Sequence, residues 1–356
     1  MKALALVEGP DHVCCRYRVL AFRPALAEAG IELEVEGIAR SPLARLAQLR
    51  RAAAYEVVLL QRKLLTAWQF QLLRRRARRL LFDFDDAVLY RDSYDRRGPH
   101  CPRRAARFAR TVRQADLVIA GNNFLAGCAT EAGAGPGRIR VIPTCIAPER
   151  YRPAPPRPDR LGLDLVWIGS SSTLRGLEAQ RPLWERLGRE VPGLRLRLIC
   201  DRFPRFDPLP VIAIPWSEAT EAEAIAAGDA GISWVPDDLW SRGKCGLKVL
   251  QYQAAGLPVI ANPVGVQATM IHPGRDGFLA ATPEAWVEAV RTLAAEPALC
   301  DRMGRAARAA VQASYSVATW APAVVAALSG RGEIVPRRHE GRPIGTTSFE
   351  LNLNQA

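Results

Sequence analysis

Short apolar runs alternate with longer amphipathic segments along most of the chain, and this alternation limits the possible folds more than any other feature. Runs such as "KALALV" (2–7) and "LDLVWIG" (163–169) are typical of buried strands, and the segments between such runs are long enough for crossover helices. This order of elements produces parallel sheets that are covered by helices. We therefore expect an α/β protein.

The candidate strands fall into two sets. The first set covers 2–7, 31–36, 55–61, 79–84, 116–120 and 139–143. The second set covers 163–169, 194–200, 211–214, 230–235, 258–262 and 277–280. Helices are expected over 16–29, 42–53, 66–78, 102–114, 122–132, 176–190, 218–227, 246–255, 284–295, 298–313 and 316–328.

A run rich in proline and charge, "PERYRPAPPRPDRLG" (148–162), separates the two sets and cannot form the interior of a strand or helix. Each half therefore has its own sheet, and such sheets bind ligands at the carboxyl ends of their strands. The expected divisions are an N-terminal domain (1–150), a linker (151–162), a C-terminal domain (163–313), a helix near the domain junction (314–329) and a largely disordered polar tail (330–356).

The net charge of +13 suits nucleic acid, an anionic membrane or a phosphorylated ligand. No nucleic-acid-binding module is recognisable, and the arginines are spread through both halves, so nucleic acid is not expected as a partner.

The eight cysteines form no C-x-x-C pair and have no histidine at zinc-ligand spacing. This pattern favours a reducing, cytoplasmic location without a bound metal. No apolar run is long enough for a transmembrane helix.

One basic amphipathic stretch, "WQFQLLRRRARRLL" (68–81), sets apolar side chains such as Trp68 among arginines. Such a segment can lie on anionic lipid, and a lipid-linked substrate would suit it. The alternative is an ordinary surface helix that packs on the sheet.

Lysine placement singles out "GKCGLKVLQYQAAGLPVIANPVG" (243–265). Among the 49 lysines and arginines, the only lysines are Lys2, Lys63, Lys244 and Lys248. Lys248 falls in the first turn of an expected helix, where a positive charge costs roughly 0.3–1 kcal/mol at exposed sites. Since a helix N-terminus attracts anions, a bound anion would explain both lysines. The alternative is that both are solvated surface charges.

Five segments resemble a known family, including "RYRVLAFRPALAEAGIELEV" (16–35) and "RIRVIPTCIAPERYRP" (138–153). "GLKVLQYQAAGLPVIANPVGVQATMIHPGRDGFLA" (246–280) resembles the donor-binding segment of the large retaining group of GT-B glycosyltransferases. "VWIGSSSTLRGLEAQ" (166–180) resembles the start of their second domain, and "LLFDFDDAV" (80–88) is similar to the Asp-x-Asp-Asp segment of a bacterial subgroup. The resemblance implies two Rossmann-like domains that face each other across a cleft. The second domain would hold a nucleotide-sugar donor and the first an acceptor, with retention of anomeric configuration and no metal.

The resemblance also implies roles for individual residues. Arg175 matches a basic residue that, with Lys244 and Lys248, would stabilise the leaving diphosphate. The donor contacts implied are Gly169, Ser170, Ser171, Thr173, Arg175, Lys244, Lys248, Gln251 and Gly265.

Two parts of this assignment carry qualifications. Gln251 stands where the family has a glutamate that binds the donor ribose, and its carbonyl can still accept a hydrogen bond. The serines and Thr173 have an alternative role, because Ser and Thr are good helix N-caps.

The acidic segment gives a candidate for the acceptor side. Asp85 lies nearest the place of a histidine that family members often carry, and Asp83 and Asp86 flank it. Crowded carboxylates could raise one pKa, and Asp85 could then position or deprotonate an acceptor hydroxyl. The alternative is a structural acidic turn.

Together these patterns predict a hexosyltransferase-type glycosyltransferase that uses a UDP- or GDP-sugar and no further cofactor. Its acceptor would be a cell-envelope polysaccharide, a lipid-linked glycan or a small molecule. It would act in the cytoplasm or peripherally on the inner face of the plasma membrane. Two alternatives stay open: a nucleotide-sugar epimerase of the same fold, and a degenerate homologue that binds nucleotide sugar without turnover.

Overall fold

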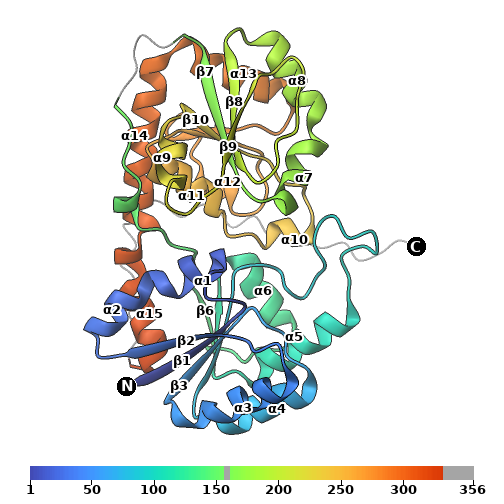
Figure 1. Cartoon of the computed structure of the whole chain (residues 1–356), viewed down its shortest axis with the longest axis vertical. Helices are drawn as coiled ribbons and strands as arrows, with labels where there is room; N and C mark the ends of the chain where they lie inside the picture. The colour runs from blue at the N-terminus through green and yellow to red at the C-terminus, as the bar shows by residue number, and fades with distance from the viewer. Residues whose placement is uncertain (156–160, 332–356) are drawn as a thin grey trace.

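Two six-stranded parallel sheets, each with its own helices, make up the computed structural model, which describes residues 1–155 and 161–331 (Figure 1). The first sheet has the order β2-β1-β3-β4-β5-β6. Its strands are β1 (Lys2–Val7), β2 (Glu32–Gly37), β3 (Val57–Gln61), β4 (Leu80–Phe84), β5 (Leu117–Ala120) and β6 (Ile139–Val141). The second sheet has the order β12-β11-β10-β7-β8-β9. Its strands are β7 (Leu163–Ile168), β8 (Leu194–Cys200), β9 (Val211–Pro215), β10 (Ala230–Ser233), β11 (Val259–Ala261) and β12 (Gly277–Leu279). The expected α/β class with two Rossmann-like domains is confirmed.

The helices lie between the strands. In the first half they are α1 (Val13–Arg18), α2 (Arg23–Glu28), α3 (Pro42–Arg51), α4 (Ala67–Arg76), α5 (Pro102–Gln114) and α6 (Asn123–Glu131). In the second half they are α7 (Ser171–Ala179), α8 (Arg181–Glu190), α9 (Glu221–Ala226), α10 (Leu239–Arg242), α11 (Leu247–Ala254), α12 (Gln267–Met270), α13 (Pro283–Ala295), α14 (Pro297–Ser314) and α15 (Val317–Ser329). None of the helices in the described part of the chain is long and apolar enough to cross a bilayer.

Two expected helices are each split in two, and proline explains both breaks. The helix expected over 16–29 is α1 and α2, joined by a short 3-10 turn, with Pro24 in the first turn of α2. The helix expected over 176–190 is α7 and α8, with Pro182 in the first turn of α8. Proline has no amide hydrogen to continue a preceding helix but suits the first turn of a new one.

The C-terminal helix α15 returns to the first domain. Val324, Ala327 and Leu328 pack in the same apolar cluster as Leu26 of α2. Figure 1 shows α14 running beside the second domain and α15 beside α2. The chain therefore connects the two domains a second time through its C-terminal helices.

Two expectations fall at least partly outside the described residues. Residues 156–160 of the expected linker lie outside them, and so do residues 332–356 of the expected tail.

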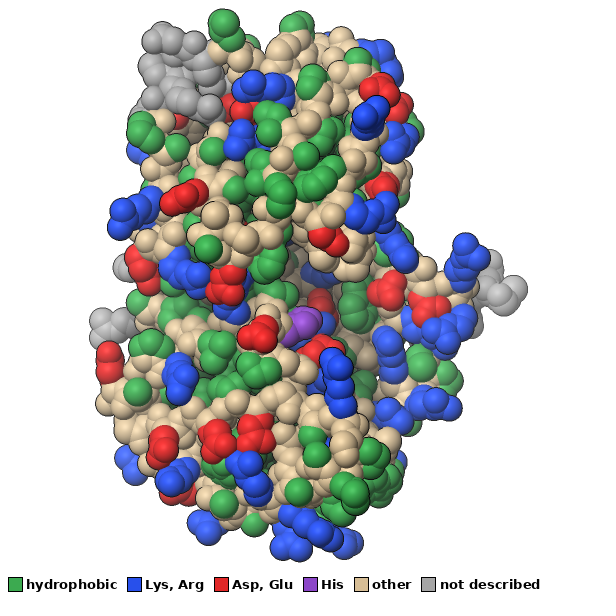
Figure 2. Space-filling model, viewed as in Figure 1, with side chains coloured by type: hydrophobic (Ala, Val, Ile, Leu, Met, Phe, Trp, Pro, Cys, Tyr) green, Lys and Arg blue, Asp and Glu red, His purple; other side chains and the backbone are tan. Residues whose placement is uncertain are grey.

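Loops at the carboxyl ends of the two sheets meet at the domain junction. Asn122, which follows β5, donates from Nδ2 to the backbone oxygens of Gly243 (3.2 Å) and Lys244 (3.1 Å). Figure 2 shows the surface hollowed between the two domains, with acidic, basic and histidine side chains gathered there. The sheets therefore place their ligand-binding edges against a shared cleft.

Candidate active site

The loop that carries the two lysines is shaped by glycine. Gly246 caps α11 with a left-handed φ of 68°, and a Cβ at this position would lie 2.5 Å from Met270 Sδ. Only glycine fits both the backbone conformation and the space. The turn brings Lys244 and the first turn of α11, with Lys248, to the same side of the second sheet.

Lys248 is held against the end of β7. Its Nζ lies 3.9 Å from the centroid of the Trp167 ring and 3.4 Å from Thr173 Oγ1. A Cβ at Gly169 would come within 2.9 Å of this Nζ, so the glycine leaves the room that the ammonium occupies. Burial, together with the neighbouring charge of Lys244, lowers the pKa of Lys248 to about 7. This site is unfavourable for a cation unless an anion joins it.

Lys244 completes a pair of like charges. Its Nζ lies 5.9 Å from the centroid of the Trp240 ring. Over residues 1–155 and 161–331, no carboxylate forms an ion pair with Lys244 or Lys248. Burial raises the pKa of the Asp86 carboxyl, and the charges of Arg62 and Lys244 oppose that rise, which indicates that Asp86 is the nearby acid.

The Ser170–Thr173 segment caps α7 beside Lys248. The Ser170 amide donates to Thr173 Oγ1 (3.2 Å), and Thr173 Oγ1 donates back to the Ser170 carbonyl (3.1 Å). The Ser171 amide donates to Asp201 Oδ1 (2.7 Å). The capping role left open from the sequence is therefore present. Contact between these hydroxyls and a phosphate stays a prediction.

Arg175 and Gly265 lie on either side of the lysine loop in the sequence. Arg175 is exposed on α7, with its guanidinium carbon 6.0 Å from the centroid of the Tyr94 ring of the first domain. It makes no hydrogen bond or ion pair with the residues that the structure describes. Gly265 has a φ of 57°, and its Cβ would lie 3.2 Å from Arg242 Cα. The contacts of Arg175 and Gly265 neither support nor contradict the predicted binding of a nucleotide-sugar donor.

Gln251 takes part in a polar network between the domains. Its Nε2 donates to the hydroxyls of Tyr17 and Tyr151, at 3.2 Å each, and the two hydroxyls lie 2.7 Å apart. Glu221 Oε1 accepts from Tyr17 (3.2 Å) and pairs with Arg16 Nη2 (2.8 Å). Because the amide nitrogen of Gln251 already donates to the two tyrosines, the predicted hydrogen bond with a ribose would have to be made by the carbonyl oxygen of Gln251.

Arginines neutralise the acidic segment after β4. Buried Asp83 forms an ion pair with buried Arg18, and Asp86 Oδ2 lies 2.6 Å from Arg62 Nη2. Asp85 Oδ1 is buried and accepts no hydrogen bond from the described residues, although Arg62 Nη1 lies 3.4 Å away. Asp83 and Asp86 therefore fit the alternative of a structural acidic turn. Asp85 does not, because its Oδ1 is still able to accept a hydrogen bond.

Sequence reasoning missed two residues that shape the cleft. Arg62 has a φ of 58°, which is rare for a residue other than glycine, and such strain is common at functional sites. Nothing marks Arg62 in a chain this rich in arginine. Asn122 caps α6 through its Oδ1, and a strand followed by asparagine could have signalled that cap. Its contact across the cleft could not have been read from the sequence.

The sequence is similar to a family model and to two curated proteins. Residues 178–326 match a family model described as glycosyl transferase-like. A D-inositol 3-phosphate glycosyltransferase of Streptomyces avermitilis is 29% identical over 240 residues, which cover 56% of this chain and 50% of that protein. The corresponding Streptomyces scabiei protein is 27% identical over 277 residues, which cover 65% of this chain and 60% of that protein. The chain thus spans between about half and three fifths of the length of these relatives.

Solved structures share the whole two-domain arrangement. Sucrose-phosphate synthase from Thermosynechococcus elongatus superposes with a TM-score of 0.67 at 18% identity, over 92% of this chain and 97% of that one. Anabaena HepE in complex with UDP-glucose superposes with a TM-score of 0.65 at 16% identity, over 93% of this chain and 100% of that one. The chain therefore shares the two-domain fold of these proteins, and residues 178–326 carry the match to the glycosyl transferase-like family model.

Proposed function

We propose that this chain transfers a sugar from a nucleotide diphosphate sugar, with retention and without a metal. The observation that carries the proposal is the lysine pair. Lys248 is desolvated against Trp167 beside a second ammonium, and no carboxylate of the described residues pairs with either. A pyrophosphate supplies the missing negative charge, which grows as the bond to the sugar breaks. UDP- or GDP-sugars are the expected donors, and the UDP-glucose bound to Anabaena HepE supports the first of these.

Asp85 is the proposed group on the acceptor side. It follows β4 at the cleft, and its Oδ1 can accept a hydrogen bond from an acceptor hydroxyl. Asp85 would orient that hydroxyl and withdraw its proton as the new bond forms. The acceptor class is a cell-envelope glycan, a lipid-linked glycan or a small molecule, and the inositol phosphate named for the Streptomyces relatives is one small candidate.

Contact with an anionic membrane is part of the proposal. Phe70 and Leu73 of α4 are buried in the core, so most of the apolar face of the 68–81 stretch packs on the sheet. Trp68 is 55% exposed on α4, and Leu43 is 79% exposed on the adjacent α3. Arg40 and Arg45 flank Leu43 in the sequence, and Arg74, Arg75 and Arg76 end the helix that carries Trp68, a combination that suits peripheral binding at the cytoplasmic face of a membrane.

The test is donor binding followed by product analysis. A ligand that binds the folded state raises the melting temperature by mass action, so UDP-, GDP- and ADP-sugars are screened by thermal shift. We expect one of them to stabilise the wild type and not Lys248→Ala. A new glycosidic bond then identifies a transferase, whereas a change of sugar configuration alone would identify an epimerase. Binding without any product would leave only a nucleotide-sugar-binding protein.

A further inference from the structure

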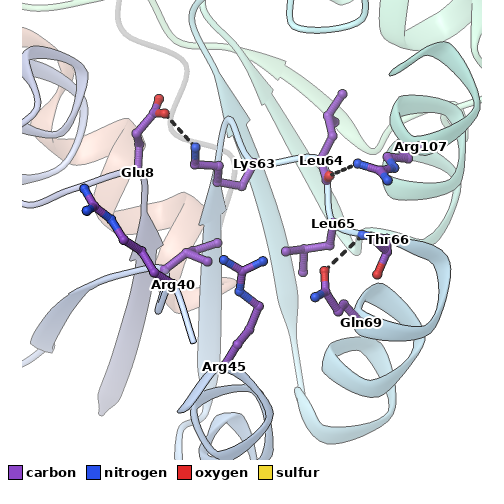
Figure 3. A pocket seen from close by; sticks show the side chains of 10 residues that line it. Glu8, Arg40, Arg45, Lys63, Leu64, Leu65, Thr66, Gln69 and Arg107 are labelled. Carbon is purple, nitrogen blue, oxygen red and sulfur yellow. Dashed lines mark hydrogen bonds and ion pairs between the residues drawn. The ribbon is translucent and has the colours of Figure 1, made fainter. Parts of the chain in front are cut away.

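A second cationic site lies in the first domain. A cavity of about 390 Å³ opens where β1, β2 and β3 end, and Figure 3 shows its lining. Arg40 and Arg45 come from the β2–α3 segment, Lys63 from the turn after β3, and Arg107 from α5. These cations come from separate segments of the chain, so they gather here through the fold and not because one helix has a charged face.

The positive charge of this cavity is only partly balanced. Glu8, which follows β1, pairs with Lys63 at 2.6 Å. Arg45 donates from Nε to the Ala39 carbonyl at 2.8 Å, and Arg107 donates from Nη1 to the Leu64 carbonyl at 3.4 Å. These bonds hold the guanidinium groups in place without neutralising them. Throughout the described ranges, no carboxylate forms an ion pair with Arg40, Arg45 or Arg107.

We propose that this cavity binds an anionic phosphate group of the acceptor, an inference that rests on the proposed transferase function. Arginine guanidinium groups are the preferred partners of phosphate oxygens because their N–H groups form paired, charge-assisted hydrogen bonds. Figure 3 shows the Arg45 side chain extending from α3 toward the segment that follows β3. A phosphate between these segments meets at least two cations.

The position of the cavity fits an acceptor that reaches the cleft. Lys63 directly follows Arg62, whose guanidinium contacts Asp85 and Asp86 at the end of the neighbouring strand. Adjacent strands lie about 4.8 Å apart and β3 is next to β4, so the end of the cavity at Lys63 is roughly 5–10 Å from the carboxylate that follows β4. That span matches a molecule with one sugar-sized ring between its phosphate and its reacting hydroxyl.

The test compares phosphorylated compounds with their unphosphorylated parents. Inositol and inositol 3-phosphate, and glucose and glucose 6-phosphate, are titrated calorimetrically into the full chain with and without UDP. We expect at least one phosphate to bind about tenfold more tightly than its parent, which is about 1.4 kcal/mol. Arg40→Gln and Arg45→Gln should each remove most of that preference. Arg40→Gln tests the effect of charge without loss of a structural contact, because Arg40 makes no hydrogen bond with a described residue.

The matched control is Arg50→Gln, which removes the same charge from the exposed end of α3 outside the cavity. If soluble phosphates bind no better than their parents, vesicles of phosphatidylcholine with and without phosphatidic acid identify a lipid phosphate as the source. Binding to the acidic vesicles must then fall in Arg45→Gln and persist in Arg50→Gln. Equal losses in the two variants, or no preference for phosphate in either assay, would overturn the proposal.

The donor assay separates this inference from the proposed function. If UDP binds and no phosphate preference exists, only the acceptor inference fails. If phosphate compounds bind through Arg45 and UDP does not bind, the transferase proposal fails and the cavity remains an anion site.

Discussion

The charged side chains at the two edges of the cleft differ in whether they have an oppositely charged partner. At the first sheet, Asp83 and Asp86 are each paired with an arginine. At the second sheet, Lys244 and Lys248 form no ion pair with a carboxylate of the described residues, and they contact aromatic rings and the Thr173 hydroxyl. Removing one partner of a buried ion pair destabilises the fold, so such a pair is needed for structure, whereas a buried charge without a partner lowers stability and is retained for a ligand. The comparison therefore assigns the acidic segment mostly to structure and the lysine pair to function.

The largest expected effect is on stability at the first edge. Asp83→Asn should lower the free energy of unfolding by about 3–5 kcal/mol, because it leaves the buried Arg18 guanidinium without its counter-charge. Urea unfolding measures the loss. Asp85→Asn is the matched control and should change stability by less than about 1 kcal/mol, since Arg62 keeps Asp86. Similar losses in both variants would break the distinction between the two carboxylates.

The next largest effect is on catalysis at the second edge. Lys248→Ala should reduce turnover about 10²–10³-fold, as expected for removing a group that stabilises developing negative charge. Its free energy of unfolding should stay the same or rise, because a desolvated cation is removed. Initial rates with a UDP-sugar and a parallel urea titration give both numbers, and Lys2→Ala at the exposed start of β1 is the control. A variant that loses stability and keeps its turnover would reverse the assignment.

A smaller effect is expected from pH. The pKa of Lys248 is lowered to about 7 by burial, and only the protonated form attracts a pyrophosphate. As pH rises through 7 the free protein loses this proton, so affinity for a UDP-sugar should fall about tenfold, or about 1.4 kcal/mol, between pH 6.5 and 8. Calorimetry with UDP-glucose measures this, because its pyrophosphate diester does not titrate in that range.

Lys248→Arg sharpens the same comparison. A guanidinium stays charged over the whole range, so this variant should bind UDP-glucose with little dependence on pH. A pH dependence equal to that of the wild type would show that another group titrates.

The sequence was a good guide to local structure. All the expected strands are present, with ends within two residues, because most of them are continuous apolar runs, as buried parallel strands usually are. The two split helices were wrong because periodicity continues across Pro24 and Pro182, and the proline should have been given more weight. The lysine turn was also found, because rare lysines stand out among arginines.

Contacts that join distant segments could not be predicted. Gln251 was expected to face a ribose, but its amide nitrogen contacts Tyr17 and Tyr151, which lie 234 and 100 residues away in the chain. Arg16 and Arg18 look like any other arginine in the sequence, but they pair with Glu221 and Asp83. In a chain with this many arginines, only the fold reveals which of them have partners.

The smallest expected effect tests the network that joins the two edges. Tyr17→Phe removes one hydroxyl between Gln251 and Glu221, and should cost about 0.5–1.5 kcal/mol of unfolding free energy, the usual value of one hydrogen bond. Tyr151→Phe should cost a similar amount. Because the two hydroxyls share the same partners, the double variant should depart from additivity by at least 0.5 kcal/mol, roughly the smallest coupling of residues in one network. Tyr55→Phe, whose hydroxyl contacts Glu34 within the first domain, should add independently to either. Strict additivity of Tyr17→Phe and Tyr151→Phe would mean that the domains are joined by separate contacts, with Gln251 left free to turn toward a ribose.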